Sequence, residues 1–169
     1  MGSLGQIRRT IEPQPHYTFP TGFFDGVAQV HKGGCGFRLW MNNTHSYKCW
    51  TGIDNCTNKF FELVAAWALL HWAKLLNILD IRIFGDSGVV IDWLASKAYL
   101  HSINLLHWFS QINNILTFFT HTILCHVYRE HNTDANILSK KGIGGTPGLL
   151  FFEELMGLNI IRVGSTILY

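Results

Sequence analysis

"LDIRIFGDSGVVIDWLAS", residues 79–96, is the stretch that decides the fold. Residues 79–86 alternate between apolar and polar side chains, which predicts a strand. Residues 87–96 follow at once with a helical pattern. Asp86 therefore stands where a strand meets a helix. A strand that leads directly into a helix is typical of a domain in which helices cover a sheet.

The flanking sequence extends this pattern in both directions. Three strands with short connections are predicted before it, and Gly33 and Gly34 would let the first connection turn tightly. Further helices and one more strand are predicted around it. The order is β-β-β-α-β-α-α-β-α, which indicates a mixed α/β (α+β) domain. The remaining predicted elements are strands 21–29, 33–43, 46–53 and 122–130 and helices 58–76, 103–119 and 132–141.

Length and composition favour one globular domain. The chain has 169 residues, is 48% hydrophobic and only 14% charged, and carries a formal net charge of +2. This excludes a disordered chain, and it means that any basic surface for nucleic acid must be local. We expect a flexible arm at 1–17, a domain at 18–145, and an apolar tail at 146–169 that packs on the domain or on a partner.

The longest apolar run and the cysteine spacing indicate where in the cell the protein is expected. The longest apolar run, residues 60–76, contains Glu62, His71 and Lys74 and is too short and too interrupted to span a bilayer. The four cysteines form no CxxC pair, which favours reduced, mostly buried thiols over a zinc site. We expect an intracellular protein of the nucleus, the cytoplasm or an organelle, monomeric as a domain.

Three acids in apolar surroundings are the candidate site. Taken alone, each has an ordinary explanation: Asp25 as a turn residue before Gly26, Glu62 as a carboxylate favoured by the helix dipole, and Asp86 as a helix N-cap. Taken in order, they place acids on two strands and on a covering helix, from where they can converge. Converging carboxylates repel one another, and divalent cations with oxygen ligands relieve that repulsion.

The sequence resembles the ribonuclease H domain, in its plant reverse-transcriptase-like branch found in non-LTR retroelements. The segments that carry the resemblance are "FFDG", "TNKFFELVAAWALLHWAKLL", "IRIFGDSGVVIDWL" and "HVYREHNTDANILSK", and they span residues 20–145. The resemblance implies a ribonuclease H-like fold with a five-stranded mixed sheet, ordered 3-2-1-4-5, and helices on both faces. It also implies hydrolysis of the RNA strand of RNA–DNA hybrids with two Mg²⁺ or Mn²⁺ ions, held by Asp25, Glu62, Asp86 and a fourth acid.

The position of the fourth acid is occupied by Asn136. An amide can offer its oxygen to a cation, but it supplies no negative charge. The resemblance therefore implies that the second ion and the rate are affected. Asp134 lies two residues earlier, about 200° away around the helix, and is expected to face away into solvent.

The remaining candidates concern proton transfer and substrate contact. His131, in the loop before the last helix, is the candidate for proton transfer, and His126 on the strand is expected to be buried. Arg129 is a candidate phosphate contact, since its fork of donors suits that task. The other candidate nucleic-acid contacts are Gly33, Gly34, Asn58 and Asn132.

Two functions follow from the sequence. The first is a metal-dependent ribonuclease acting on RNA–DNA hybrids, attenuated by Asn136. The second is a catalytically silent, retroelement-derived domain that binds nucleic acid or serves in an assembly. In the second case the apolar tail at 146–169 is the expected surface for a protein partner.

Overall fold

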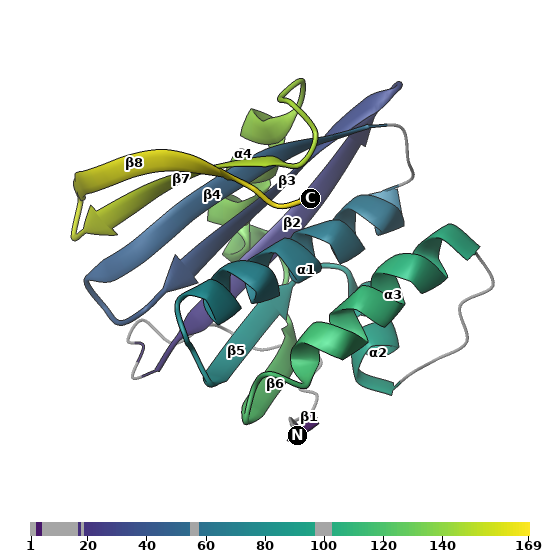
Figure 1. Cartoon of the computed structure of the whole chain (residues 1–169), viewed down its shortest axis with the longest axis horizontal. Coiled ribbons are helices and arrows are strands. Elements are labelled where there is room, and N and C mark those ends of the chain that lie inside the picture. Colours follow the sequence, from purple (N-terminus) through teal and green to yellow (C-terminus); the bar gives the residue numbers. More distant parts are fainter. Residues whose placement is uncertain (1–2, 5–16, 18, 55–57, 97–102) are drawn as a thin grey trace.

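The computed structural model describes residues 3–4, 17, 19–54, 58–96 and 103–169. The described part of the chain forms one sheet with helices on both faces (Figure 1). Its strands are β1 (Ser3–Leu4), β2 (Thr21–Gln29), β3 (Lys32–Trp40), β4 (His45–Asp54), β5 (Asp80–Gly85), β6 (His121–His126), β7 (Leu149–Met156) and β8 (Asn159–Ile167). Its helices are α1 (Asn58–Leu75), α2 (Gly88–Ser96), α3 (Ile103–Leu116), the short 3₁₀ helix η1 (Arg129–His131) and α4 (Thr133–Gly142).

The sheet has the order β1-β6-β5-β2-β3-β4-β7-β8. Its central five strands, β4-β3-β2-β5-β6, are the predicted strands in the predicted order 3-2-1-4-5. β2, β3 and β4 form an antiparallel meander, and β5 and β6 join it as parallel strands. The mixed sheet is confirmed, but it has eight strands rather than five because β1, β7 and β8 extend its two edges.

Helix α1 forms the centre of the core on one face of the sheet. Apart from its ends it is apolar on almost every side, and Phe61, Leu63, Ala65 and Leu69 are fully buried. A helix without a polar face can be stable only between other layers. Accordingly, α1 packs on β2 and β3 beneath and against α3 at its side, as Figure 1 shows.

Helix α4 covers the other face and lies directly on the glycines of β3. A Cβ atom at Gly34 would collide with the backbone of Ser139, and one at Gly36 would lie 2.5 Å from Leu138. These glycines are therefore required for close packing of a helix on a strand. The prediction that Gly33 and Gly34 form the turn is wrong. Both are buried inside β3, and the turn is formed before it, where His31 has a positive φ of 65°.

The apolar tail is a β-hairpin that extends the sheet. β7 pairs antiparallel with β4, and β8 pairs antiparallel with β7. Gly157 begins the tight turn between them with a φ of 60°, a conformation that glycine adopts without strain. Tail residues Leu150, Leu155 and Leu168 are buried. The hairpin is thus part of the folded unit.

Two predicted boundaries change. Within the expected arm at 1–17, Ser3 and Leu4 pair in parallel with β6, while residues 5–16 lie outside the described part of the chain. The strand predicted for 122–130 ends at His126, and Arg129–His131 turn as η1 before α4 begins. No helix among the described residues is long and apolar enough to cross a membrane. Cys35, Cys49 and Cys125, the described cysteines, are buried and form no disulfide.

Candidate active site

The register of two parallel strands brings the first two acids together. β2 and β5 pair from Thr21↔Arg82 as far as Phe24↔Gly85. The next residues are Asp25, within β2, and Asp86, directly after β5, at the point where the two segments separate. Side chains at this edge of parallel strands point into a shared crevice, which is where ligands bind in sheets of this kind.

Glu62 comes from α1, whose N-terminal part lies directly on β2. Gly26 makes that approach possible, because a Cβ atom there would lie 2.6 Å from the backbone nitrogen of Glu62. As a result, one carboxylate oxygen from each of Asp25, Glu62 and Asp86 lies within 4.8 Å of the others. The predicted convergence of the three acids is what the structure shows. Glu62 lies in the second turn of α1 rather than in its first.

The electrostatics of this cluster are unfavourable for carboxylates without a cation. Burial raises the pKa of Glu62 well above its usual range, and so do a hydrogen bond with Asp25 and the charges of Asp25 and Asp86. The backbone N–H of Gly26 offsets these effects only in part. Glu62 Oε2 is buried and accepts no hydrogen bond from any described residue. A buried oxygen in this state carries an uncompensated cost.

Asp86 is held in place by Asn132. The Asn132 side-chain amide donates to Asp86 Oδ2 at 3.3 Å and to the carbonyl oxygen of Phe24 at 3.0 Å, so it bridges the two strand ends. Burial and the charge of Asp25 raise the pKa of Asp86, while Asn132, Arg129 and His126 oppose that rise. Asn132 itself is only 1% exposed. It therefore positions Asp86, and its predicted contact with nucleic acid stays a prediction.

Asn136 lies in the site, as its place at the fourth acid position of the motif predicted. Its side-chain amide donates to Asp25 Oδ2 at 2.9 Å, and the backbone N–H of Gly26 donates to Asp25 Oδ1 at 2.9 Å. Both oxygens of Asp25 are thus stabilised by neutral donors. Asp134 faces away from the cluster, as expected, but it is not merely solvated. It accepts a hydrogen bond from the buried Arg38 guanidinium at 3.0 Å.

The basic residues at the site differ from those expected. His126, which was predicted to be buried, is partly exposed, and its Nε2 lies 3.2 Å from the backbone oxygen of Asp86. His131 lies in η1, 3.9 Å from Glu130, and the structure gives it no contact with the three acids. Arg129 is exposed, and its positive charge lowers the pKa of Asp86. The sequence feature that could have identified His126 is its position at the end of β6, the strand that pairs with β5 just before Asp86.

Two other predicted contacts have different outcomes. Gly33 and Gly34 are covered by Phe61 on one face and by α4 on the other, so neither is available to a nucleic acid. Asn58 is the first residue of α1, but its side chain lies outside the described part of the chain.

The residues present fit a hard divalent cation. The donors are carboxylate oxygens, which Mg²⁺ and Mn²⁺ prefer over nitrogen or sulfur. One of the oxygens is buried without a partner, and the two raised pKa values would fall towards normal beside a cation. The arrangement is therefore a candidate metal site at the edge of the sheet.

Comparison with known proteins is consistent with this geometry. The sequence profile described as reverse transcriptase-like matches residues 23–142, which contain all four site positions. The chain belongs to the reverse transcriptase-like family. No protein with a curated description matches this member of the family.

Solved structures show the same fold at low sequence identity. The RNase H1 of the halophilic archaeon Halobacterium salinarum NRC-1 is 22% identical, with a TM-score of 0.64 over 73% of this chain and 96% of that one. The N-terminal RNase H domain of a Mycobacterium tuberculosis protein is 20% identical, with a TM-score of 0.64 over 73% and 91%. LC11-RNase H1, solved in complex with an RNA/DNA hybrid, is 16% identical, with a TM-score of 0.63 over 72% and 94%. The ribonuclease H fold predicted from the sequence is confirmed.

Proposed function

We propose that this protein hydrolyses the RNA strand of RNA–DNA hybrids with the help of divalent metal ions. The observation that carries the proposal is the convergence of Asp25, Glu62 and Asp86 within 4.8 Å at the separating ends of two parallel strands. The substrate class is supported by the family and by LC11-RNase H1, a protein of the same fold solved with an RNA/DNA hybrid.

The three acids and their neighbours have separate tasks in the proposed mechanism. Asp25, Glu62 and Asp86 would together hold the Mg²⁺ or Mn²⁺ ions. Bound there, the ions would lower the pKa of the attacking water and stabilise the leaving oxygen. The chain itself positions the acids: Asn132 orients Asp86, and Gly26 orients Asp25. Arg129 would contact a phosphate, and His131 is the proposed proton-transfer residue.

In this proposal, Asn136 lowers the rate of cleavage. Because its amide donates to Asp25 Oδ2, it competes with a cation for that oxygen. It also leaves the fourth ligand position neutral, so the second ion binds more weakly than it would to a carboxylate. In this proposal the enzyme cleaves slowly and requires a higher metal concentration.

The test is cleavage of an RNA–DNA hybrid whose RNA strand is labelled, in Mg²⁺, by the parent protein and by Asp25→Asn. Asp80→Asn is the matched control, because Asp80 is an exposed aspartate that pairs with His121 outside the site. We expect metal-dependent cleavage by the parent and the control and none by Asp25→Asn. Equal cleavage by all three proteins would overturn the proposal.

The alternative is a silent domain that binds nucleic acid or serves in an assembly. One observation favours it: the hydrogen bond from Asn136 partly satisfies Asp25 without any metal. Hybrid binding without cleavage, unrestored by Asn136→Asp, would establish this second function. An origin from a plant retroelement, which comes from the resemblance of the sequence, and a protein partner at residues 146–169, which comes from the apolar character of that tail, are part of the same proposal.

A further inference from the structure

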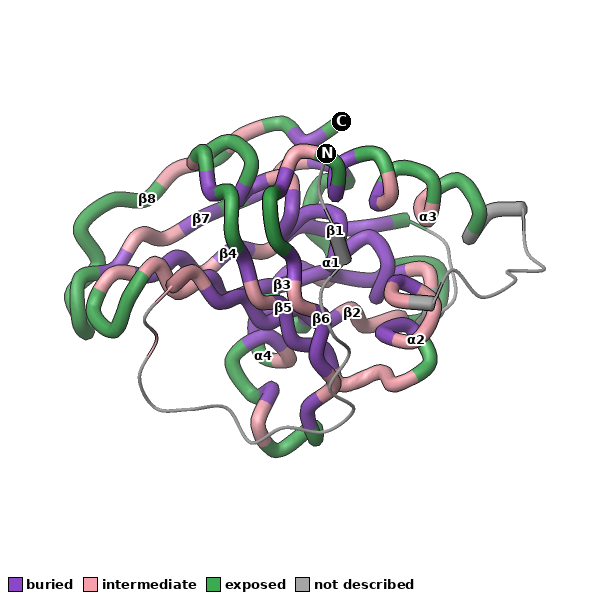
Figure 2. Tube along the Cα trace, turned by 90° about the horizontal axis from the view of Figure 1, so that it is seen from below, coloured by how far each residue is buried: buried purple, intermediate pink, exposed green. Residues whose placement is uncertain are grey.

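The exposed apolar residues of this protein are concentrated in the C-terminal hairpin. Among the described residues, eight of the fifteen large hydrophobic side chains that are exposed lie between 151 and 169: Phe151, Met156, Leu158, Ile160, Ile161, Val163, Ile167 and Tyr169. Figure 2 shows β8 mostly in the colour of exposed residues. Such a concentration at one end of a sheet marks an interaction surface.

β8 is also an open edge of the sheet. Within the described part of the chain it pairs only with β7, so its outer backbone N–H and C=O groups have no strand beside them. Its one irregularity lies at Ile161, where the pairing shifts between Glu154 and Leu155. From Arg162 to Ile167 the strand is regular and contains neither proline nor lysine. Proline and lysine are two of the residues that discourage pairing at an edge.

The charges around this edge are already compensated within the chain. Arg162, the only charged residue of β8, donates to Glu154 at 2.9 Å and covers the Phe152 ring at 5.0 Å. On the opposite face, Glu153 lies across from Lys48 in the pairing of β4 and β7. Lys141 of α4 also lies near this surface, over the Trp50 ring at 3.9 Å. The charge carried by β8 itself would therefore not repel that of a second copy.

The apolar side chains next to the edge form a surface suited to the same encounter. Val163 is 65% exposed and, with Trp50 and Phe151, lines an open pocket of about 400 Å³ on the face that carries α4. Helix α4 packs on β2, β3 and β4, and the pocket lies beyond it, over β7 and β8. Ile167, 76% exposed, lies further along β8.

We infer that a second copy of this chain occupies the edge, with the two β8 strands antiparallel about a two-fold axis. A strand that meets its own copy in this way offers each backbone donor an acceptor, and it continues the sheet from one molecule into the other. It also brings Val163 of each copy close to the other and shields both apolar surfaces from water. The proposed dimer replaces the expected monomer. It stands on the sheet edge alone and is independent of the nuclease activity.

The experiment is the molar mass of the full chain in solution, measured by light scattering and sedimentation over a range of concentrations. The variant is Val163→Lys, which places a charge at the contact. The matched control is Val30→Lys, because Val30 is 81% exposed and lies in the turn between β2 and β3, away from the hairpin. Circular dichroism of all three proteins confirms that each is folded.

We expect the parent and Val30→Lys to dimerise and the dissociation constant of Val163→Lys to rise by at least about tenfold, as expected for a charge placed in a contact. Hydrogen exchange of the parent should slow at residues 162–167 as the concentration rises. A parent that is monomeric at every concentration would overturn the proposal. So would a dimer whose dissociation constant Val163→Lys leaves unchanged, or one that slows exchange elsewhere only.

Discussion

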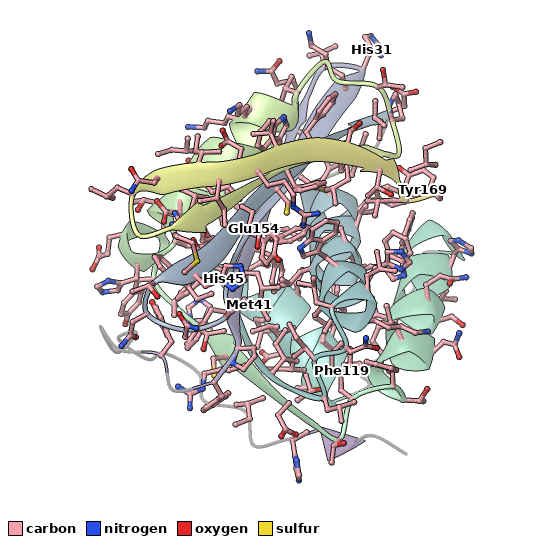
Figure 3. All side chains as sticks on the ribbon, turned by 60° about the vertical axis from the view of Figure 1, so that its left-hand side comes forward. His31, Met41, His45, Phe119, Glu154 and Tyr169 are labelled. Carbon is pink, nitrogen blue, oxygen red and sulfur yellow. The ribbon has the colours of Figure 1, made fainter. Side chains whose placement is uncertain are left out.

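Two sites in this protein hold carboxylates, three acids in one and Glu154 alone in the other, and their electrostatics are opposite. Asp25, Glu62 and Asp86 meet at the separating ends of β2 and β5. Glu154, on β7, meets His45, Tyr47 and Arg162, with His45 Nε2 2.6 Å and Tyr47 Oη 3.1 Å from the same carboxylate oxygen. Figure 3 shows His45 and Glu154 next to each other beneath the hairpin.

The difference lies in what surrounds each carboxylate. Burial alone would raise the pKa of Glu154, but hydrogen bonds from His45, Arg162 and Tyr47 lower it below its usual range. Burial also raises the pKa of Glu62, and there the neighbouring acids raise it further. The Glu154 carboxylate is compensated by these partners, and its hydrogen bonds link β7 to β4 and β8. The Glu62 cluster has no comparable compensation among the described residues, which makes it the candidate functional site.

The largest expected difference between the two sites is in catalysis. Asp86→Asn removes a carboxylate from the three-acid site and should lower the cleavage rate by roughly a hundredfold or more, the size seen when charge stabilisation at a reacting centre is lost. Glu154→Gln removes one from the Glu154 site and should leave the rate unchanged. Both rates are measured on the same labelled hybrid. A comparable loss of cleavage rate in both variants would contradict the distinction between the two sites.

Adding a carboxylate to the three-acid site should increase its electrostatic difference from the Glu154 site. Asn136→Asp removes the hydrogen bond to Asp25 Oδ2 and adds negative charge to an already strained cluster. We expect a lower melting temperature without metal, a larger rise in melting temperature on adding Mn²⁺, and cleavage faster by about tenfold, which corresponds to a barrier lower by about 1.4 kcal/mol. Asp134→Asn, on the outer side of α4, should produce no gain in metal response. An Asn136→Asp protein with the metal response of the parent would contradict this account.

The third prediction concerns pH and stability. Because the pKa of Glu62 is raised in the folded state, its contribution to stability is fully present below its unfolded pKa of about 4.3 and is lost as the pH rises through the folded pKa. Glu62→Gln cannot ionise. In EDTA it should therefore melt at a higher temperature than the parent at pH 8 and at a similar temperature near pH 4.

The gain at pH 8 should amount to a few degrees, since about 1 kcal/mol corresponds to roughly 2–4 °C in a domain of this size. Glu130→Gln, which removes a carboxyl group with a 76% exposed side chain, is the control and should show no such gain. A Glu62→Gln protein that is less stable than the parent at pH 8 would show that the cluster is not under electrostatic strain.

The smallest effect is expected at Glu154. Its lowered pKa means that its contribution to stability is present above the unfolded pKa of about 4.3 and is lost as the pH falls through the folded pKa. Glu154→Gln should destabilise the protein at pH 7 by about 0.2–1 kcal/mol, the range of partly exposed ion pairs. The deficit should disappear in acid, which thermal melts at the two pH values would show. A deficit that persists below pH 3 would point to packing rather than charge.

The sequence was sufficient for the parts of the fold that depend on local pattern. The alternation in β5 and the helical spacing of α1 are properties of neighbouring residues, and such patterns placed Asp25 on the first core strand, Glu62 near the start of the helix, and Asp86 directly after β5. The convergence of the acids followed from that order. Asn136 could also be placed, because the spacing along α4 fixes which of its residues faces the strands.

The parts that the sequence did not show depend on contacts between distant residues. Asn132 was predicted at the start of a helix as a contact for nucleic acid, but its amide donates to the backbone of Phe24, 108 residues earlier. Gly33 and Gly34 look like a turn, and only the approach of α4 shows why they are glycines. The tail was expected to pack on the domain or on a partner, but its two strands were not recognised, because apolar residues in β7 occupy both buried and exposed positions. Its one local signal was Gly157, before the turn to β8.

The measurement that tests the central claim most directly is a calorimetric titration of Mn²⁺ into the metal-free protein near neutral pH. If the carboxylate cluster is incomplete without a cation, the parent should bind Mn²⁺ and release protons on binding, because the cation displaces the proton that the raised pKa of Glu62 favours. Asp25→Asn should lose this binding, and Glu154→Gln should keep it. Binding that is absent from the parent, or equal in the parent and Asp25→Asn, would contradict the account.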